Sequence, residues 1–110
     1  MAMVVKRFDI WLVDLNPVVG SEISKTRPCV VISPNEVNGT LATVTIAAMT
    51  SANKPYPHRV NCVFQQKQGQ IALDHIRSVS KIRLLKKIGV MDEKTSRLIC
   101  ETLTEMFSFE

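Results

Sequence analysis

The spacing of apolar residues changes once along this chain, and that change restricts the possible folds more than any other feature. Up to Gly89 the apolar residues form short runs or strict alternations separated by proline, glycine and asparagine, which predicts strands and turns. From Asp92 onward the apolar residues recur at helical spacing, with Asp92 as the expected N-cap. The recurring residues are Leu98, Ile99, Leu103, Met106 and Phe107. One amphipathic helix therefore closes a chain that is otherwise built of strands.

The expected strands are short and follow one another closely. Their ranges are 8–16, 28–33, 41–48, 58–64, 71–80 and 82–85, with Gly89 ending the last. In the third range, Val44, Ile46 and Ala48 point to one face of the sheet. The sequence therefore predicts a mainly β fold with a C-terminal helix, as a small curved antiparallel sheet or partly open barrel.

Length and composition limit the other possibilities. The 110 residues fit a single domain over residues 1–110, and 45% hydrophobic with 22% charged residues predicts a folded chain. No apolar run reaches about 18 residues, and Asp9 and Asp14 interrupt any signal-peptide core, so we expect a cytoplasmic protein. The net charge of +4 favours polyanionic partners without identifying one.

The cysteines and histidines indicate neither disulfides nor a metal site. Cys29, Cys62 and Cys100 are odd in number and lie among apolar residues, so we interpret them as small hydrophobic side chains. His58, Cys62 and His75 match no common zinc-ligand spacing. We therefore expect no metal and no cofactor.

Three polar segments are the candidate functional loops, although the third overlaps the expected strand 71–80. These segments span residues 20–27, 50–54 and 74–77, and the first belongs to an eleven-residue loop, which is long for a small domain. Catalytic groups that converge from different strand ends typically lie in such segments. We expect the three segments to meet on one surface.

Four blocks of this sequence together resemble the MazF/PemK family of toxin endoribonucleases. They read DIWLVDLNPVVGSE, KTRPCVVISP, TSANKPYP and GQIALDHIRSVSKIRL, the last followed by KKIG, and the resemblance covers residues 7–107. It implies a small SH3-like barrel that forms a homodimer and cuts single-stranded mRNA as the toxin of a type II toxin–antitoxin pair. It also implies cleavage without a metal, products with a 2′,3′-cyclic phosphate and a 5′-hydroxyl, and silencing by a cognate antitoxin peptide.

The resemblance assigns two principal catalytic residues, Arg27 and Thr50. The planar guanidinium of Arg27 suits the phosphate, and Pro28 disfavours helix at Arg27, which places this side chain at a rigid strand start. Thr50 matches the family's essential threonine, with Ser51 as its neighbour and possible substitute. On residues alone, Arg27 could instead pair with Glu22, and Thr50 with Ser51 could merely form a turn.

The proton-transfer groups are less clearly assigned. Glu22 either accepts the 2′-hydroxyl proton or holds Arg27 in place. Asp74 matches an acid that some relatives use as a base, but the arginine that serves as their acid is replaced here by Ala72. His75 stands where relatives more often carry glutamine, and it is a candidate for the missing acid or for a base-contacting side chain.

RNA contacts are expected from the basic side chains. The candidates are Lys25, Lys54, Arg77, Lys81 and Arg83, with Lys86 and Lys87 nearby. We expect Trp11 in the core and Tyr56 beside the groove. Two alternatives stay open: a noncatalytic toxin like the CcdB-type gyrase poisons, which bind a protein target, and a noncatalytic RNA-binding barrel, which the 5% aromatic content does not favour.

Overall fold

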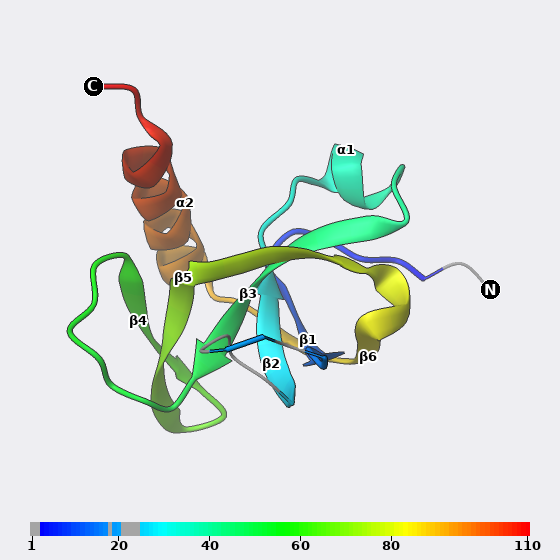
Figure 1. Ribbon diagram of the computed structural model, residues 1–110, viewed down its shortest axis with the longest axis horizontal. Coiled ribbons are helices and arrows are strands. Elements are labelled where there is room, and N and C mark those ends of the chain that lie inside the picture. The colour runs from blue at the N-terminus through cyan, green and yellow to red at the C-terminus, as the bar shows by residue number, and fades with distance from the viewer. Residues whose placement is uncertain (1–2, 18, 21–24) are drawn as a thin grey trace.

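The computed structural model describes residues 3–17, 19–20 and 25–110 and shows one sheet with a C-terminal helix (Figure 1). The elements in order are β1 (Asp9–Asp14), β2 (Thr26–Val31), α1 (Asn35–Asn38), β3 (Thr43–Thr50), β4 (Arg59–Phe64), β5 (Lys67–Ser80), η1 (Lys81–Arg83), β6 (Leu84–Val90) and α2 (Glu93–Phe107). The six strands are antiparallel in the order β4-β5-β3-β2-β1-β6. The predicted fold class is confirmed.

Each face of the sheet carries its own hydrophobic core, and β3 contributes to both. Val44, Ile46 and Ala48 enter one core, as their alternation predicts, while Ala47 and Met49 enter the other. The second core is covered by α2, whose Ile99 is fully buried. A strand with apolar residues on both faces must lie in the middle of a layered structure, which fixes β3 as the centre of this fold.

The C-terminal helix begins where the sequence predicts. The carboxylate of Asp92 accepts a hydrogen bond from the backbone N–H of Thr95 at 2.9 Å, which is the expected N-cap interaction. Leu103 and Met106 pack with Ile99 against the sheet. No helix in the described part of the chain is long and apolar enough to cross a membrane.

The prediction that Gly89 ends a strand is wrong, because Gly89 lies inside β6 and pairs with Ile10 of β1. A Cβ atom at this position would lie 3.0 Å from the ring of Phe64. Glycine at this position therefore favours close packing against Phe64 and does not mark a turn. The expected strands 58–64 and 71–80 leave residues 65–70 between them, but the turn is shorter, since β5 already starts at Lys67 after Gln65 and Gln66 turn with positive φ.

The cysteines behave as small hydrophobic side chains. Cys29 and Cys62 are buried, and Cys100 is half-buried. Burial raises the pKa of the Cys29 thiol to about 12 and also raises the pKa of Cys62, so neither forms a reactive thiolate near neutral pH. The interpretation from the sequence is confirmed for these two residues.

Candidate functional site

The sheet register brings Arg27 and Thr50 together. Cys29 pairs with Ala48 across β2 and β3, and continuing that antiparallel register places Arg27 opposite Thr50. Side chains of directly opposed residues project from the same face of an antiparallel sheet. The observed pairs end at Cys29 and Ala48, and the continued register assigns these two groups, more than twenty residues apart in the sequence, to one face at the end where β2 begins and β3 stops.

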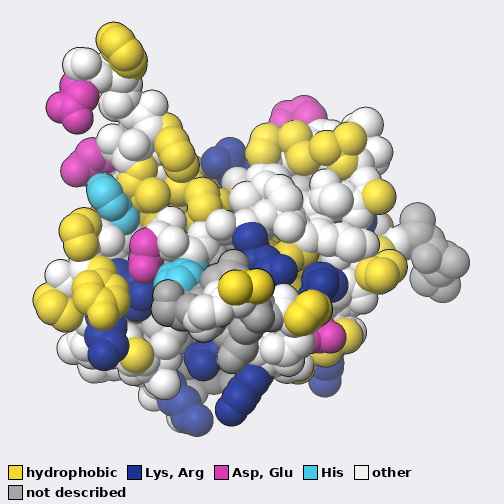
Figure 2. Space-filling model, in the orientation of Figure 1, with side chains coloured by type: hydrophobic (Ala, Val, Ile, Leu, Met, Phe, Trp, Pro, Cys, Tyr) yellow, Lys and Arg dark blue, Asp and Glu magenta, His cyan; other side chains and the backbone are white. Residues whose placement is uncertain are grey.

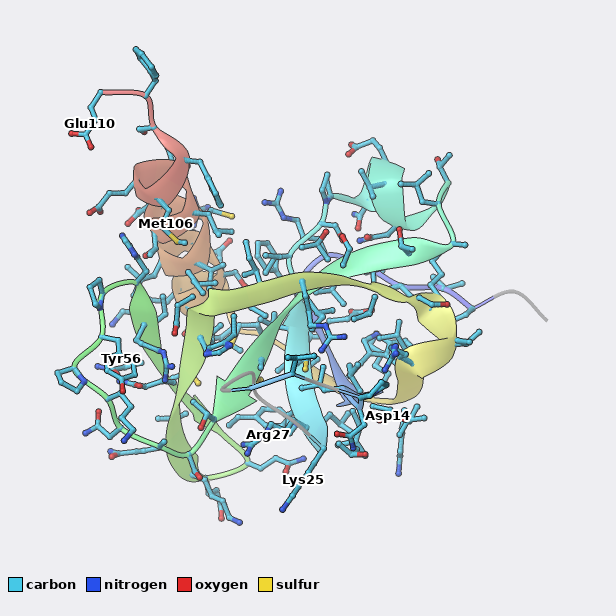
Figure 3. All side chains as sticks on the ribbon, in the orientation of Figure 1. Asp14, Lys25, Arg27, Tyr56, Met106 and Glu110 are labelled. Carbon is cyan, nitrogen blue, oxygen red and sulfur yellow. The ribbon has the colours of Figure 1, made fainter. Side chains whose placement is uncertain are left out.

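Cross-strand neighbours of Thr50 extend this group of polar residues to the edge strand β4. Thr50 pairs with Gln70 of β5, and Gln70 pairs with Asn61 of β4. Figure 3 shows Arg27 and Lys25 beside this end of the sheet, and Figure 2 shows Lys and Arg side chains gathered over the same half of the molecule. A positive potential over this face favours a polyanionic ligand.

The hydroxyl of Thr50 is oriented by its own turn. It accepts a hydrogen bond from the backbone N–H of Ala52 at 3.1 Å. This is the turn interaction that the sequence left open as an alternative, but a hydroxyl that accepts one bond still carries a proton to donate. The same group can therefore shape the turn and donate to a phosphate oxygen.

Gly69 lets the β4–β5 hairpin approach this turn closely. A Cβ atom on Gly69 would lie 2.6 Å from the backbone carbonyl oxygen of Thr50. That distance is well inside van der Waals contact, so any other residue would push β5 away from the end of β3. The position of Thr50 depends on this contact.

Gln70 is a polar group that sequence reasoning missed. Its side chain is 5% exposed and lies between the strands and the segment that follows Thr50. The amide nitrogen donates to Asn53 Oδ1 at 3.1 Å and to the carbonyl of Lys54 at 3.0 Å, and the amide oxygen accepts from the Lys54 N–H at 3.1 Å. One buried amide thus fixes residues 53–54. The only signal in the sequence was a glutamine directly before a buried apolar run.

Asp74 and His75 lie in a bulge of β5 and not in a loop between strands. The β3–β5 register jumps from Ala47 opposite Ile76 to Ala48 opposite Ala72, which leaves three residues of β5 without partners. Bulges of this kind redirect side chains and are common beside active sites. Here the bulge borders a hollow of about 290 Å³, lined by Leu15, Ile46, Ala48, Asp74, His75, Ile76 and Arg77.

Asp74 is held by an arginine that the sequence analysis did not select. Arg59 Nε donates to Asp74 Oδ1 at 2.6 Å and Nη2 donates to Oδ2 at 3.0 Å, while the Arg59 side chain is only 6% exposed. Hydrogen bonding to Arg59 is the main reason that the pKa of Asp74 lies below its usual value. A carboxylate stabilised in this way is a poorer proton acceptor, which weakens the assignment of Asp74 as a general base.

His75 lies beside this ion pair. Its Nε2 is 3.6 Å from Asp74 Oδ2, and the imidazole side chain is 29% exposed. The imidazole is therefore accessible to a ligand in the hollow. A role in proton transfer or in contact with a base remains a prediction for this residue.

Two of the predicted RNA-binding arginines are bound to the backbone at the end of β1. Arg77 Nη1 donates to the carbonyl of Leu15 at 3.2 Å, and Arg83 Nη1 donates to the carbonyl of Asp14 at 3.0 Å and to that of Asn16. These bonds position the segment that leads into residues 17–25. Arg77 and Arg83 therefore also hold the backbone of residues 14–16 at the end of β1.

The predicted lysines divide between the two ends of the sheet. Lys25 and Lys54 are exposed at the end that carries Arg27 and Thr50. Lys81 instead donates to the carbonyl of Asn38 and follows β5 at the far end of β3. The structure therefore does not bring Lys81 together with the other candidates.

The remaining candidates lie elsewhere. Glu22 falls outside the described residues. Ser51 lines a second hollow of about 740 Å³ between the β4–β5 hairpin and the first turn of α2. Within residues 3–17, 19–20 and 25–110, no three His, Cys, Asp or Glu side chains are grouped as metal ligands would be.

Comparisons with known proteins point to one family. A family model described as a PemK-like, MazF-like toxin of type II toxin-antitoxin systems matches residues 6–107. Endoribonuclease EndoA of Bacillus subtilis (strain 168) is 34% identical over 107 residues, which cover 92% of each chain. Endoribonuclease MazF of Staphylococcus epidermidis is 36% identical over 95 residues, covering 81% of this chain and 79% of that relative.

Solved structures show the same fold at lower sequence identity. MazF from Deinococcus radiodurans superposes with a TM-score of 0.85 at 22% identity, covering 98% of this chain and all of that one. An endoribonuclease in complex with its cognate antitoxin from a mycobacterial species gives a TM-score of 0.79 at 19% identity, covering 96% of this chain and 99% of that one. The sheet, its order and the C-terminal helix are therefore shared.

Proposed function

Since this chain belongs to the PemK-like, MazF-like toxins of type II toxin–antitoxin systems and is an endoribonuclease of that class, we propose that it cuts single-stranded mRNA at selected sequences without a metal ion. The observation that supports this proposal is the β2–β3 register, which, when continued by two residues, assigns Arg27 and Thr50 to one face of the sheet. A guanidinium and a hydroxyl at a rigid strand end can together hold a phosphate.

The proposed reaction is an in-line displacement at one phosphodiester. The ribose 2′-oxygen attacks phosphorus and loses its proton to a base, while the bond from phosphorus to the 5′-oxygen breaks and that oxygen takes up a proton. The products carry a 2′,3′-cyclic phosphate and a 5′-hydroxyl. Negative charge grows on the nonbridging oxygens as the 2′-oxygen attacks, so fixed donors lower the barrier.

The side chains divide this work. Arg27 donates two parallel hydrogen bonds to nonbridging oxygens, and Thr50 donates one, with Lys25 and Lys54 holding flanking phosphates. Glu22 is the proposed base or the partner of Arg27. Arg59 leaves Asp74 poorly suited as the base.

The proposed biological unit is a cytoplasmic homodimer of a single toxin domain over residues 1–110, silenced by a cognate antitoxin peptide. Support comes from relatives: structures of MazE–MazF from Deinococcus radiodurans and of a mycobacterial endoribonuclease with its antitoxin share this fold.

Cleavage of mixed-sequence RNA should persist in excess chelator and weaken steeply with rising salt. Chelation removes nothing that this mechanism uses, whereas salt competes with several phosphate contacts. The measurement is the cleavage rate of purified protein with and without EDTA over a salt series, with mapping of the product ends. Activity that is lost in EDTA and restored by magnesium would contradict the mechanism, and growth arrest without any RNA cleavage would favour a CcdB-like mode of action.

His75→Gln should change the pH profile of cleavage very little. Glutamine can make similar hydrogen bonds, and Arg27 and Thr50 are expected to supply most of the stabilisation. The test compares kcat from about pH 5 to 9 for both proteins, the range in which a histidine titrates. If the rate falls by about a hundredfold and a titration near neutral pH disappears while the fold is intact, His75 is a general acid.

A further inference from the structure

Tyr56 presents an aromatic ring to solvent beside the site. It is the only tyrosine of the chain, lies between β3 and β4, and is 51% exposed. The guanidinium of Arg59 stacks over the ring, 5.1 Å from its centroid. Arg59 thus covers one side of the ring, while about half of the residue stays exposed to solvent. Figure 3 shows Tyr56 on the part of the molecule formed by this segment and the β4–β5 hairpin.

The ring is fixed in place before any ligand binds. Arg59 behind it is tied to Asp74 by two hydrogen bonds and to Gln70 by a third at 3.5 Å. Prolines at 55 and 57 restrict the backbone on either side of Tyr56, and Gln70 holds the preceding Lys54 through both backbone groups. A surface that is ordered in advance loses little conformational entropy when it binds a ligand.

The chemistry of this surface fits a flat, neutral ring. The carboxylate of Asp74 neutralises the charge of Arg59, so Arg59 does not attract a phosphate to this position. The guanidinium still lies against the Tyr56 ring as an oriented cation. In the described part of the chain the Tyr56 hydroxyl makes no hydrogen bond, so the variant Tyr56→Phe can separate the hydroxyl from the ring face. Nucleobases stack on such rings whatever their sequence.

We propose that Tyr56, backed by Arg59, is a stacking platform for one unpaired base of the RNA, close to the scissile phosphate. This rests on the proposed function. The segment that carries Tyr56 leaves the sheet at Thr50 and returns at Arg59, which pairs with Ala72 in the row next to Thr50 and Gln70. A strand held at Arg27 and Thr50 and running toward β4 therefore reaches the ring within a few nucleotides.

The experiment compares Tyr56→Leu with Tyr56→Phe, because leucine removes the aromatic face and phenylalanine keeps it. The probes are single-stranded RNA decamers centred on the mapped cleavage position, with a 2′-deoxynucleotide there to prevent cutting and 2-aminopurine at one position at a time. In the wild type and Tyr56→Phe, the fluorescence of 2-aminopurine should be quenched at one position. In Tyr56→Leu that quenching should disappear, and the affinity should fall by roughly five- to a hundredfold.

Two controls distinguish the loss of stacking from a loss of folding or of nonspecific RNA binding. Phe109→Leu makes the same change on a fully exposed residue near the C-terminus and should leave RNA affinity unchanged. Circular dichroism and thermal melting show whether Tyr56→Leu is folded. Unaltered affinity and quenching in a folded Tyr56→Leu protein would overturn the proposal, as would equal losses in Tyr56→Phe.

Two further outcomes are informative. If Tyr56→Leu binds RNA normally but loses affinity for the cognate antitoxin, the ring is a protein-binding surface and the proposal is wrong. If the wild type cuts no RNA, the proposed function fails. Stacking on Tyr56 is then tested by measuring the fluorescence of mixed-sequence decamers that contain 2-aminopurine when they bind. The two proposals therefore fail independently.

Discussion

Replacing Arg27 by alanine should lower the rate of RNA cleavage by roughly a hundredfold or more, since a preorganised donor to a developing oxyanion contributes about 2.7–4 kcal/mol. The guanidinium lies at the start of β2, directly before Pro28, and the register sets it opposite Thr50. Its position is therefore fixed by the sheet and not by the ligand. The measurement is the single-turnover rate on an RNA that contains a mapped cleavage site.

Arg27→Lys is the matched control. Lysine keeps the positive charge but not the planar pair of donors, so its rate should fall between those of the wild type and the alanine variant. Both variants should fold and bind the antitoxin, because Arg27 is outside the two hydrophobic cores. Near-normal turnover of a folded Arg27→Ala protein would show that Arg27 has no catalytic role.

Thr50→Ala should lower the rate of RNA cleavage by a similar factor, on the order of a hundredfold, because the substitution removes the hydroxyl donor. The change also removes the hydrogen bond from Ala52 N–H, so part of the effect could come from a displaced turn. Thr50→Ser separates the two causes, since serine keeps the hydroxyl and can form the same turn.

We therefore expect Thr50→Ser to retain most of the activity and Thr50→Ala to lose it, with melting temperatures measured for both. If serine is as inactive as alanine while both proteins are folded, the hydroxyl is not the reacting group. If alanine is active, Thr50 serves only the turn.

The parts of the fold that were predictable depend on neighbouring residues along the chain. The alternation in β3 and the N-cap at Asp92 are local signals, and the structure confirms both. Arg27 and Thr50 could be selected because their motifs are contiguous, although their roles stay predictions. A local pattern predicts the face of the sheet to which each side chain points, but it says little about which strand pairs with the one that carries the pattern.

The parts that could not be predicted depend on contacts between distant segments. Gly89 appeared to be a strand breaker because its reason for being glycine is the ring of Phe64 on another strand. Arg59 could not be selected because its partner Asp74 is placed by a bulge, which only the pairing of β5 with β3 creates. Gln70 could not be selected because its hydrogen-bond partners lie on the segment that follows β3.

The close approach at Gly69 has a consequence for how this lineage can diversify. The carbonyl of Thr50 occupies the space that any side chain at position 69 would need, so the placement of the Thr50 hydroxyl is inherited together with a residue that has no chemistry of its own. Exposed residues of the β4–β5 hairpin can change one at a time, yet a first mutation at Gly69 would move the whole hairpin away from that hydroxyl at once. With Thr50 in its proposed role, selection on cleavage acts on an absent methyl group as well as on the reacting groups.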